Sequence, residues 1–202
     1  MKTNYKLIKD IIKSNGGYIT RKDINRHNIP SIYLSNYVKE HNLEKYGTGF
    51  YAEQSWIPDY HLIFQYEYPK FIYSFYTAQY YLKLGDSNPW FLEVTGPKNY
   101  RPFPLPKDGV VVHTDTKDET YNLGITEMET NFGYKIKVYD MEKTVCDFIK
   151  NRDRIEAESF VKCMHFYKRK KDKDLGRLFK YAKIMKIYDK VFEIMELLLN
   201  EE

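Results

Sequence analysis

Residues 28–39 read "NIPSIYLSNYVK", and the fold of the first quarter of the chain depends on how this stretch is interpreted. Pro30 favours a break, and Ser31 after it can cap the start of a helix. At about 100° per residue, a helix here has two different sides. One side carries Leu34, Tyr37 and Val38, and the other carries Ile32, Ser35, Asn36 and Lys39, with Tyr33 at the flank. The pattern therefore predicts a helix with one core side and one side free for a partner.

The segments around this helix follow the order of a winged helix-turn-helix. Apolar residues at helical spacing over residues 4–14 predict a first helix, which ends at a glycine pair. The short strand "YIT" precedes a second helix, with Thr20 as its N-cap and Asp23 in its first turn. After the third helix, two short strands joined by a turn at residues 47–49 would form the wing. We therefore expect a winged helix-turn-helix domain at residues 1–56.

The remainder, residues 57–202, predicts a second and mixed α/β domain, so the expected fold class is α+β. Residues 55–65 are interpreted as the crossing between the domains, with Pro58 as the break. A small sheet flanked by helices and a helical tail should follow. The expected elements are a helix after Pro69 that ends at Gly85, strands at 90–96, 110–115, 122–130 and 134–140, a loop at 97–109, a helix capped by Asp140, and helices near 155–167, 174–184 and 187–200.

Charge is distributed unevenly along the chain. The formal net charge is +4, made up of +4 over residues 1–56, −4 over 57–149, +8 over 150–190 and −4 over the last twelve residues. Basic blocks suggest an anionic partner, although lysine-rich helices also keep proteins in solution. Two separated cysteines without a CxxC pair, no signal peptide and no membrane-spanning apolar run favour a cytoplasmic protein that has no membrane partner.

Signatures of an enzyme are missing from the sequence. Its five histidines lie far apart, its glycines are scattered at turns, and it has neither HExxH nor GxSxG. We therefore expect no catalytic activity, no cofactor and no metal. The rival interpretation is a small metal-dependent nuclease, for which Glu93, Asp108, Glu127 and Lys135 would have to meet. These residues also fit solvent-facing positions of amphipathic strands, which is the favoured interpretation.

Binding of DNA is the best-supported function of the first domain. Asparagine can bond the adenine edge, isoleucine can contact a thymine methyl group, and hydroxyl groups can reach bases or phosphates. The start of the second helix combines backbone N–H groups with positive charge, which suits a phosphate. The predicted contacts to DNA are Thr20, Arg21, Lys22, Ser31, Ile32, Tyr33, Ser35, Asn36, Lys39, Lys45 and Thr48. The alternative is a winged helix that serves as an adaptor and contacts only proteins.

A second basic region begins with "YKRKKDKD" at residues 167–174. It could contact nucleic acid or an acidic protein, but a solvated loop between helices is the favoured interpretation. The helix after it is amphipathic. Leu175, Leu178, Phe179 and Ala182 lie on one face, and Arg177, Lys180 and Lys183 lie on the other.

Three stretches together resemble AbiEi-type antitoxins of AbiE (type IV) toxin–antitoxin systems, which are abortive-infection operons of bacterial phage defence. They read "GGYITRKDINRHNIPSIYLSNYVKEHNLEKYGTGFYA", "YPKFIYSFYTAQYYLKLGDSNPWFLEVTGP" and "KVYDMEKTVCDFIKNRD", in the same order along nearly the whole chain. The resemblance implies an N-terminal domain that binds inverted repeats in its own promoter and represses the operon. It also implies a C-terminal domain that counteracts a nucleotidyltransferase-like toxin, with direct contact left open.

The resemblance also sets expectations about partners. Double-stranded DNA with an inverted repeat implies two copies of the protein on the operator, whatever its state in solution. The expected state in solution is a monomer. The basic side chains of the C-terminal helices offer a surface for the antitoxin activity. These are Lys168, Arg169, Lys170, Lys171, Arg177, Lys180 and Lys183.

Overall fold

The computed structural model describes residues 2–86, 88–102 and 109–200, and the chain is α+β. It divides into two compact units, Met1–Glu67 and Tyr68–Glu202. The boundary falls about ten residues later than the predicted boundary at residue 56. The reason is that the segment expected to cross between domains folds into a helix of the first unit.

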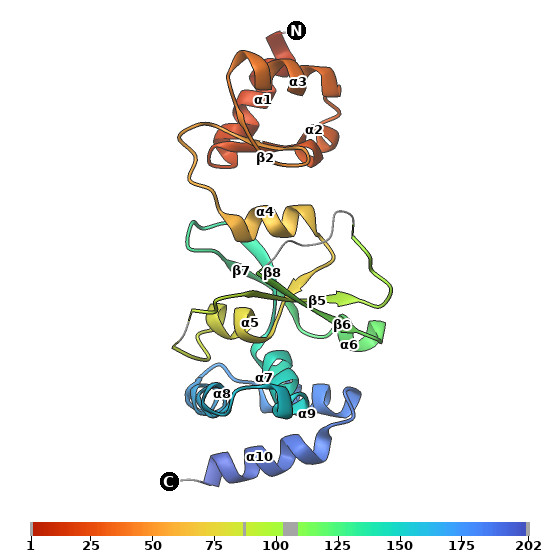
Figure 1. The fold of residues 1–202 in the computed structure, drawn as a ribbon, viewed down its shortest axis with the longest axis vertical. Helices are drawn as coiled ribbons and strands as arrows, with labels where there is room; N and C mark the ends of the chain where they lie inside the picture. Colours follow the sequence, from red (N-terminus) through yellow and green to blue (C-terminus); the bar gives the residue numbers. More distant parts are fainter. Residues whose placement is uncertain (1, 87, 103–108, 201–202) are drawn as a thin grey trace. The chain divides into compact units, whose positions relative to one another are not determined.

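The first unit consists of helices and a small antiparallel sheet (Figure 1, red to orange). Its elements are α1 (Lys2–Ser14), β1 (Tyr18–Thr20), α2 (Arg21–Arg26), α3 (Ser31–Glu40), β2 (Glu44–Gly47), β3 (Phe50–Ala52) and α4 (Tyr60–Glu67). The strands lie in the order β1-β3-β2. All the elements predicted up to β3 are present, with ends within a few residues of those expected.

One hydrophobic core holds the first three helices on the sheet. Its buried members are Ile8, Ile11, Ile12, Ile19, Ile24, Ile29, Leu34 and Tyr37. The predicted cap of α2 is confirmed, since the Thr20 hydroxyl accepts from the Asp23 amide at 3.2 Å. The predicted cap of α3 is wrong: its N-cap is Pro30, and Ser31 is the first helical residue. The extended backbone of Pro30 starts this helix one residue earlier than expected.

Helix α4 covers the sheet face that points away from this core. The Asp59 carboxylate accepts the amides of His61 and Leu62, both at 3.0 Å, and so caps the start of the helix. The Tyr66 ring packs edge-on against Phe50, with centroids 5.3 Å apart. The segment after Pro58, which was predicted to cross between the domains, is therefore not a linker. It forms a capped helix whose aromatic residues pack on the sheet.

The second unit is built around a five-stranded mixed sheet with the strand order β6-β5-β4-β8-β7 (Figure 1). Its elements are β4 (Ile72–Tyr73), α5 (Phe75–Tyr81), β5 (Leu92–Pro97), β6 (Val110–Asp115), α6 (Asp118–Tyr121), β7 (Ile125–Glu129), β8 (Lys135–Tyr139), α7 (Met141–Lys150), the 3-10 helix η1 (Arg152–Arg154), α8 (Ala157–Arg169), α9 (Leu175–Ile184) and α10 (Tyr188–Asn200). β4 runs antiparallel to β5 and parallel to β8, β5 runs parallel to β6, and β7 runs antiparallel to β8.

The single helix predicted between Pro69 and Gly85 is wrong. The structure has the central strand β4 there, followed by the short helix α5. Both residues of β4 are buried between β5 and β8, and such a short apolar run looks the same in a strand and in a helix. Of the loop predicted at residues 97–109, residues 103–108 lie outside the described part of the chain.

The helices of the second unit stack away from the sheet in layers (Figure 1). α5 and α7 contact the sheet or each other, α8 and α9 pack on α7, and α10 packs on α8 and α9. The buried Glu142 carboxylate joins three of them, since it accepts the Asp174 amide at 2.9 Å and the Tyr167 hydroxyl at 3.3 Å. Within the described residues, no helix is both long and apolar enough to span a membrane.

Candidate nucleic-acid interface

The two predicted sides of α3 are present in the structure. Leu34 and Tyr37 are buried in the core and Val38 is half-buried. Ile32 is 59% exposed, although it is a large apolar residue. The remaining outward residues, Ser31, Ser35, Asn36 and Lys39, are exposed, and Tyr33 is half-buried at the flank. One helix face is thus anchored, and the opposite face presents an amide, hydroxyls, a cation and an aliphatic group to solvent.

Aromatic contacts hold α3 in place from its inner side. The Tyr5 ring of α1 meets the rings of Tyr37 and Tyr33 edge-on, with centroids 5.3 and 6.3 Å apart. The Tyr5 hydroxyl donates to Glu40 at 2.9 Å, which occupies the one acidic side chain of α3. Burial raises the pKa of Tyr37, so its phenol stays neutral inside the core. A helix held this firmly presents its outer side chains from a rigid base.

The outer hydroxyl groups of α3 are partly used within the helix. Ser35 donates its hydroxyl to the Ser31 carbonyl at 3.3 Å. Its lone pairs remain able to accept a bond from a partner. Asn36 and Lys39 therefore carry the exposed donors of this face, and the Asn36 amide offers the paired donor and acceptor that match an adenine edge.

Thr20 does not fit its predicted role as a phosphate contact. The residue is 4% exposed, and its hydroxyl donates to the Asp23 carboxylate at 2.6 Å. That carboxylate also accepts the Thr20 backbone N–H at 2.9 Å. The Thr20 hydroxyl and backbone N–H, which were expected to bind a phosphate, are therefore already bonded within the capping box. The Asp23 carboxylate also places a negative charge at the start of α2. Phosphate binding at α2 must depend on side chains instead.

The two cations at the start of α2 differ in their surroundings. Both side chains are exposed. Lys22 folds toward α4, where its ammonium lies 3.4 Å from the Tyr66 carbonyl oxygen and 4.7 Å from the centre of the Tyr66 ring. The Arg21 backbone N–H donates to the Gly49 carbonyl at 2.7 Å, and its side chain forms no ion pair with a residue that the structure describes. A phosphate contact by Lys22 would require release from α4, whereas Arg21 needs no such change.

The turn between β2 and β3 is attached firmly to the rest of the first unit. Gly49 has φ of +76°, and a Cβ there would lie 2.9 Å from the Cβ of Arg21. The Tyr66 hydroxyl donates to the Gly49 carbonyl at 3.0 Å. Thr48 and Lys45 are exposed on the hairpin, as predicted. These contacts hold the turn, with Thr48 in it, at a defined place beside the start of α2, and Lys45 lies on the outer strand of the hairpin.

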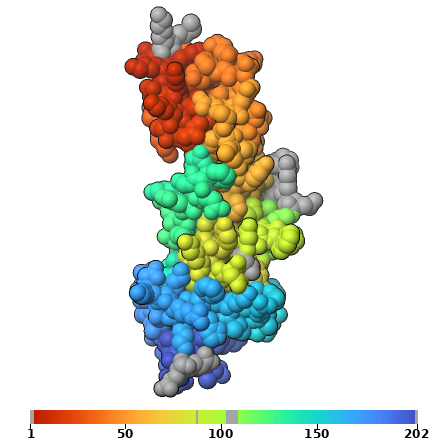
Figure 2. All heavy atoms as spheres, turned by 90° about the vertical axis from the view of Figure 1, so that its left-hand side faces the viewer, coloured from red at the N-terminus to blue at the C-terminus, as the bar shows by residue number. Residues whose placement is uncertain are grey.

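In the second unit, the side chains of the predicted basic surface differ in their contacts and in their exposure. Arg177 lies 3.7 Å from Asp140, 3.7 Å from Glu142 and 3.5 Å from Asp174, so it balances charge between helices. The Lys183 ammonium lies 5.1 Å from the centre of the Tyr188 ring. Arg169, Lys171 and Lys180 are exposed, and Lys168 and Lys170 are half-buried. Figure 2 shows one face of these helices in blue, at the surface of the second unit.

The described structure does not bring Glu93 together with Glu127 and Lys135, as the nuclease alternative would require. Glu93 bonds His113 at 2.9 Å, and Glu127 pairs with Lys135 at 3.4 Å at an exposed position. Their strands β5 and β7 are separated in the sheet by β4 and β8. Asp108 lies outside the described residues. Over residues 2–86, 88–102 and 109–200, no group of three or more His, Cys, Asp or Glu residues could hold a metal ion.

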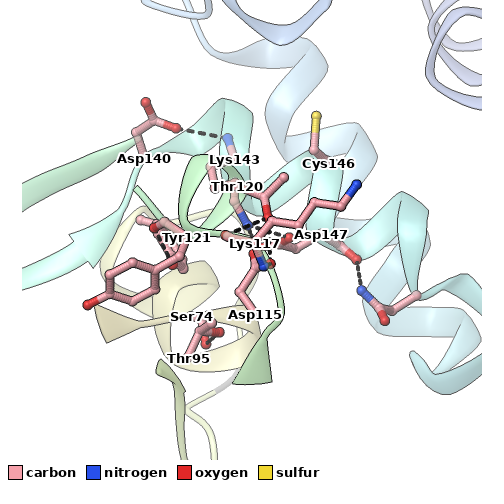
Figure 3. A network of polar contacts seen from close by, with 12 residues as sticks. Ser74, Thr95, Asp115, Lys117, Thr120, Tyr121, Asp140, Lys143, Cys146 and Asp147 are labelled. Carbon is pink, nitrogen blue, oxygen red and sulfur yellow. Dashed lines mark hydrogen bonds and ion pairs between the residues drawn. The ribbon is translucent and has the colours of Figure 1, made fainter. Parts of the chain in front are cut away.

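Sequence reasoning missed a buried polar network in the second unit. Lys143 and Asp147 on α7 form an ion pair with distances of 2.7 and 2.8 Å, and both are buried. Figure 3 shows them close to Asp115 and to the bonded pair Ser74 and Thr95. The spacing i, i+4 of a lysine and an aspartate is the same as that of a solvated helix face. The spacing of Lys143 and Asp147 in the sequence therefore did not indicate that the pair is buried.

Comparison with known proteins gives information on the fold. No family model matches the sequence, and no curated protein matches it. A solved structure with a similar fold is that of the RV2827C protein from Mycobacterium tuberculosis. The TM-score is 0.56 at 12% sequence identity, and the match covers 96% of this chain and 79% of that chain. At this identity the similarity concerns the fold alone, and it agrees with the α+β class of this chain.

Proposed function

We propose that this protein is a DNA-binding transcriptional autorepressor and antitoxin, whose first unit is a winged helix-turn-helix. In this proposal α2 and α3 form the helix-turn-helix, α3 enters the major groove, and the β2–β3 hairpin is the wing. Helix α4 is an addition that braces the wing from behind through Tyr66. The protein acts without catalysis or a cofactor.

The observation that carries the proposal is the exposed side of α3. A helix in a small unit that exposes Ile32 to 59%, next to Asn36 and Lys39, has a surface suited to a base edge and a thymine methyl group. The core side of the same helix is fully used by the unit itself. The outer side is therefore available to a partner.

Contacts to phosphates would come from Arg21, Lys39 and Lys45, with Thr48 at the wing. Two copies on an inverted repeat would make about six such cationic contacts, so log K should fall with log salt with a slope of about −5. Lys22 can add to this only when DNA displaces it from Tyr66. Because α3 itself holds a single lysine, its contribution is mainly to sequence reading.

The test is retardation of the DNA upstream of the protein's own gene. The variant Asn36→Ala/Lys39→Ala should weaken binding by at least about tenfold, because it removes an amide that reads a base and a phosphate contact. Lys9→Ala on α1 is the matched control, since Lys9 is an exposed lysine of the same unit. Unchanged affinity in the double variant would exclude α3 as the reading helix.

The adaptor alternative predicts a different outcome of the same assay. A winged helix that contacts only proteins should not distinguish operator DNA from shuffled DNA of equal length. Preference for the operator of at least about a hundredfold is expected for a specific repressor. Equal retention on both DNAs at about 0.15 M salt would favour the adaptor.

The antitoxin part of the proposal rests on the resemblance to AbiEi-type proteins. The second unit would counteract a nucleotidyltransferase-like toxin encoded next to this gene, and the basic side chains of α8 and α9 would support that activity. Arg177 is excluded from this set of basic side chains, because it is held by ion pairs to carboxylates of its own unit. Co-expression with the neighbouring gene tests this part: Arg169→Ala/Lys171→Ala/Lys180→Ala should reduce rescue from the toxin, and Asn36→Ala/Lys39→Ala should leave rescue intact.

A further inference from the structure

The second unit contains a cavity of about 290 Å³ beside the edge strand of its sheet. One wall is the strand β6 and the residue after it, and the other wall is formed by α7 and the turn into η1. Thr95 and His113 are register partners on neighbouring strands and both line it. The volume is close to the lower end of the range for pockets that bind small molecules, and it far exceeds the space of a single phosphate ion.

One side of the cavity is apolar and aromatic. The half-buried ring of His113 lies 4.1 Å from the buried ring of Phe75. Phe75 has φ of +46°, which is an unfavourable backbone conformation for a bulky residue. Such strain is tolerated where the surrounding structure enforces it, and it is concentrated at binding sites. This side offers a surface on which a planar ring can lie.

The floor of the cavity consists of one ion pair and a further carboxylate, that of Asp115. The Lys143 ammonium bonds both oxygens of Asp147, at 2.7 and 2.8 Å, and it lies 4.4 Å from the centre of the Tyr139 ring. Asp115 accepts the Thr120 hydroxyl and the Lys117 backbone N–H. Both carboxylates are therefore already engaged, as Figure 3 shows for Asp147 and Asp115. The charge of Asp147 is balanced by Lys143, whereas Asp115 keeps its negative charge, which Lys150 and Arg154 would have to outweigh when an anion binds.

The rim carries cations without such partners. Lys150 and Arg154 line the cavity and are exposed, and neither forms an ion pair with any residue that the structure describes. Both lie near the C-terminal end of α7, where the helix dipole is negative. An anion here must therefore be held by these side chains, and not by backbone N–H groups. The Asn151 amide and the Thr116 hydroxyl add neutral hydrogen-bonding groups.

We propose that this cavity binds a nucleoside phosphate, with its phosphate on Lys150 and Arg154 and its base on the side of His113. The proposal combines the size of the cavity, an aromatic side, neutral hydrogen-bonding groups for a sugar and two unpaired cations at the opening. This would be a site for a small molecule in the second unit, separate from the DNA-binding helix of the first unit.

The experiment is isothermal titration calorimetry on the full chain, with the four common nucleoside monophosphates and triphosphates as probes. Inorganic phosphate and the bare nucleosides are the comparison ligands. At least one nucleotide should bind with a stoichiometry of one, and at least about tenfold more tightly than inorganic phosphate or its own nucleoside. If no nucleotide shows saturable binding up to about 1 mM, or if inorganic phosphate binds equally well, the proposal is wrong.

Two variants test the position of the site. Lys150→Ala/Arg154→Ala should weaken nucleotide binding by at least about tenfold, because it removes both charge-assisted contacts to the phosphate. Thr116→Trp should weaken it as well by filling the mouth of the cavity without a change of charge. Lys98→Ala/Lys190→Ala removes two exposed lysines elsewhere in the same unit and should leave the affinity unchanged within about twofold. Binding that survives both site variants would place the ligand elsewhere and overturn the assignment.

Discussion

Helices α3 and α7 are both ten residues long, yet they bury very different parts of their sequences. In α3 two residues are buried, Leu34 and Tyr37, and the outer face is left to solvent. In α7 eight residues are buried, including Lys143 and Asp147. Both helices contain apolar residues at helical spacing, so the pattern alone does not distinguish them.

The difference follows from the number of neighbours that each helix has. α3 lies at the surface of a small unit and needs only one apolar stripe. α7 is packed against α5, α8, α9 and α10, so its polar residues are enclosed together with its apolar ones. Enclosed charges are tolerated only when they are paired and hydrogen-bonded. An exposed polar face, such as that of α3, is available to a partner molecule. The polar side chains of a buried face, such as that of α7, must first be paired with groups of the same chain.

The largest effect is expected from breaking the buried pair of α7. Asp147→Ala leaves the Lys143 ammonium buried without its partner, so the second unit should lose about 3–5 kcal/mol of unfolding free energy. The double variant Lys143→Met/Asp147→Leu removes both charges and should recover most of the loss. Urea unfolding followed by circular dichroism measures both variants, with Lys150→Ala as the exposed control on the same helix. Equal stability of Asp147→Ala and wild type would show that the pair is not enclosed.

The next effect concerns the core side of α3. Leu34→Ala should destabilise the first unit by about 2–5 kcal/mol, since it leaves a cavity in the core. Asn36→Ala on the opposite side should change stability by no more than about 0.5 kcal/mol. Hydrogen exchange of peptides from α1 to α3 reports on this unit alone. A similar loss in both variants would contradict the two-sided description of the helix.

A smaller effect is expected at the start of α2. Thr20→Ala removes the cap at Asp23 and should cost about 1 kcal/mol of stability. Because the hydroxyl is buried, affinity for DNA under conditions where the unit stays folded should not fall. Arg21→Ala is the converse variant, with an expected loss of DNA affinity and little change of stability. A loss of DNA affinity in the folded Thr20→Ala variant would show that Thr20 does contact DNA.

The smallest effect is a pH dependence at α4. Burial lowers the pKa of His61 below its ordinary value of 6.5. The unfolded chain therefore takes up this proton first as the pH falls below about 6.5, so protonation favours unfolding of the first unit there. The contribution should be absent at pH values well above 6.5, where His61 is neutral in both states. Urea midpoints at about pH 7.5 and pH 5.5 should differ less for His61→Gln than for wild type.

Local signals in the sequence were sufficient for most of the first unit. Glycine turns, the Thr20 cap and the helical spacing around Leu34 each act within a few residues, so their outcome can be predicted without tertiary contacts. The same reasoning identified the inner residues of α7 and its Asp140 cap. The candidate reading face of α3 was therefore available from the sequence, as the complement of the residues that the core requires.

The remaining features depended on what packs against each segment. Ile72–Tyr73 form a central strand because β5 and β8 pair with them on both sides. Helix α4 belongs to the first unit because its Tyr66 packs on Phe50 of the sheet. Arg177 does not belong to the free basic surface, because two carboxylates at the start of α7 and the Asp174 cap of its own helix lie close to it. The cavity beside β6 joins residues from four segments of the chain. The sequence alone determined helices such as α1, α3 and α7 and their apolar faces, because their caps and helical spacing depend on neighbours along the chain. Only the tertiary structure decided which charged residues are enclosed, because enclosure depends on neighbours in space.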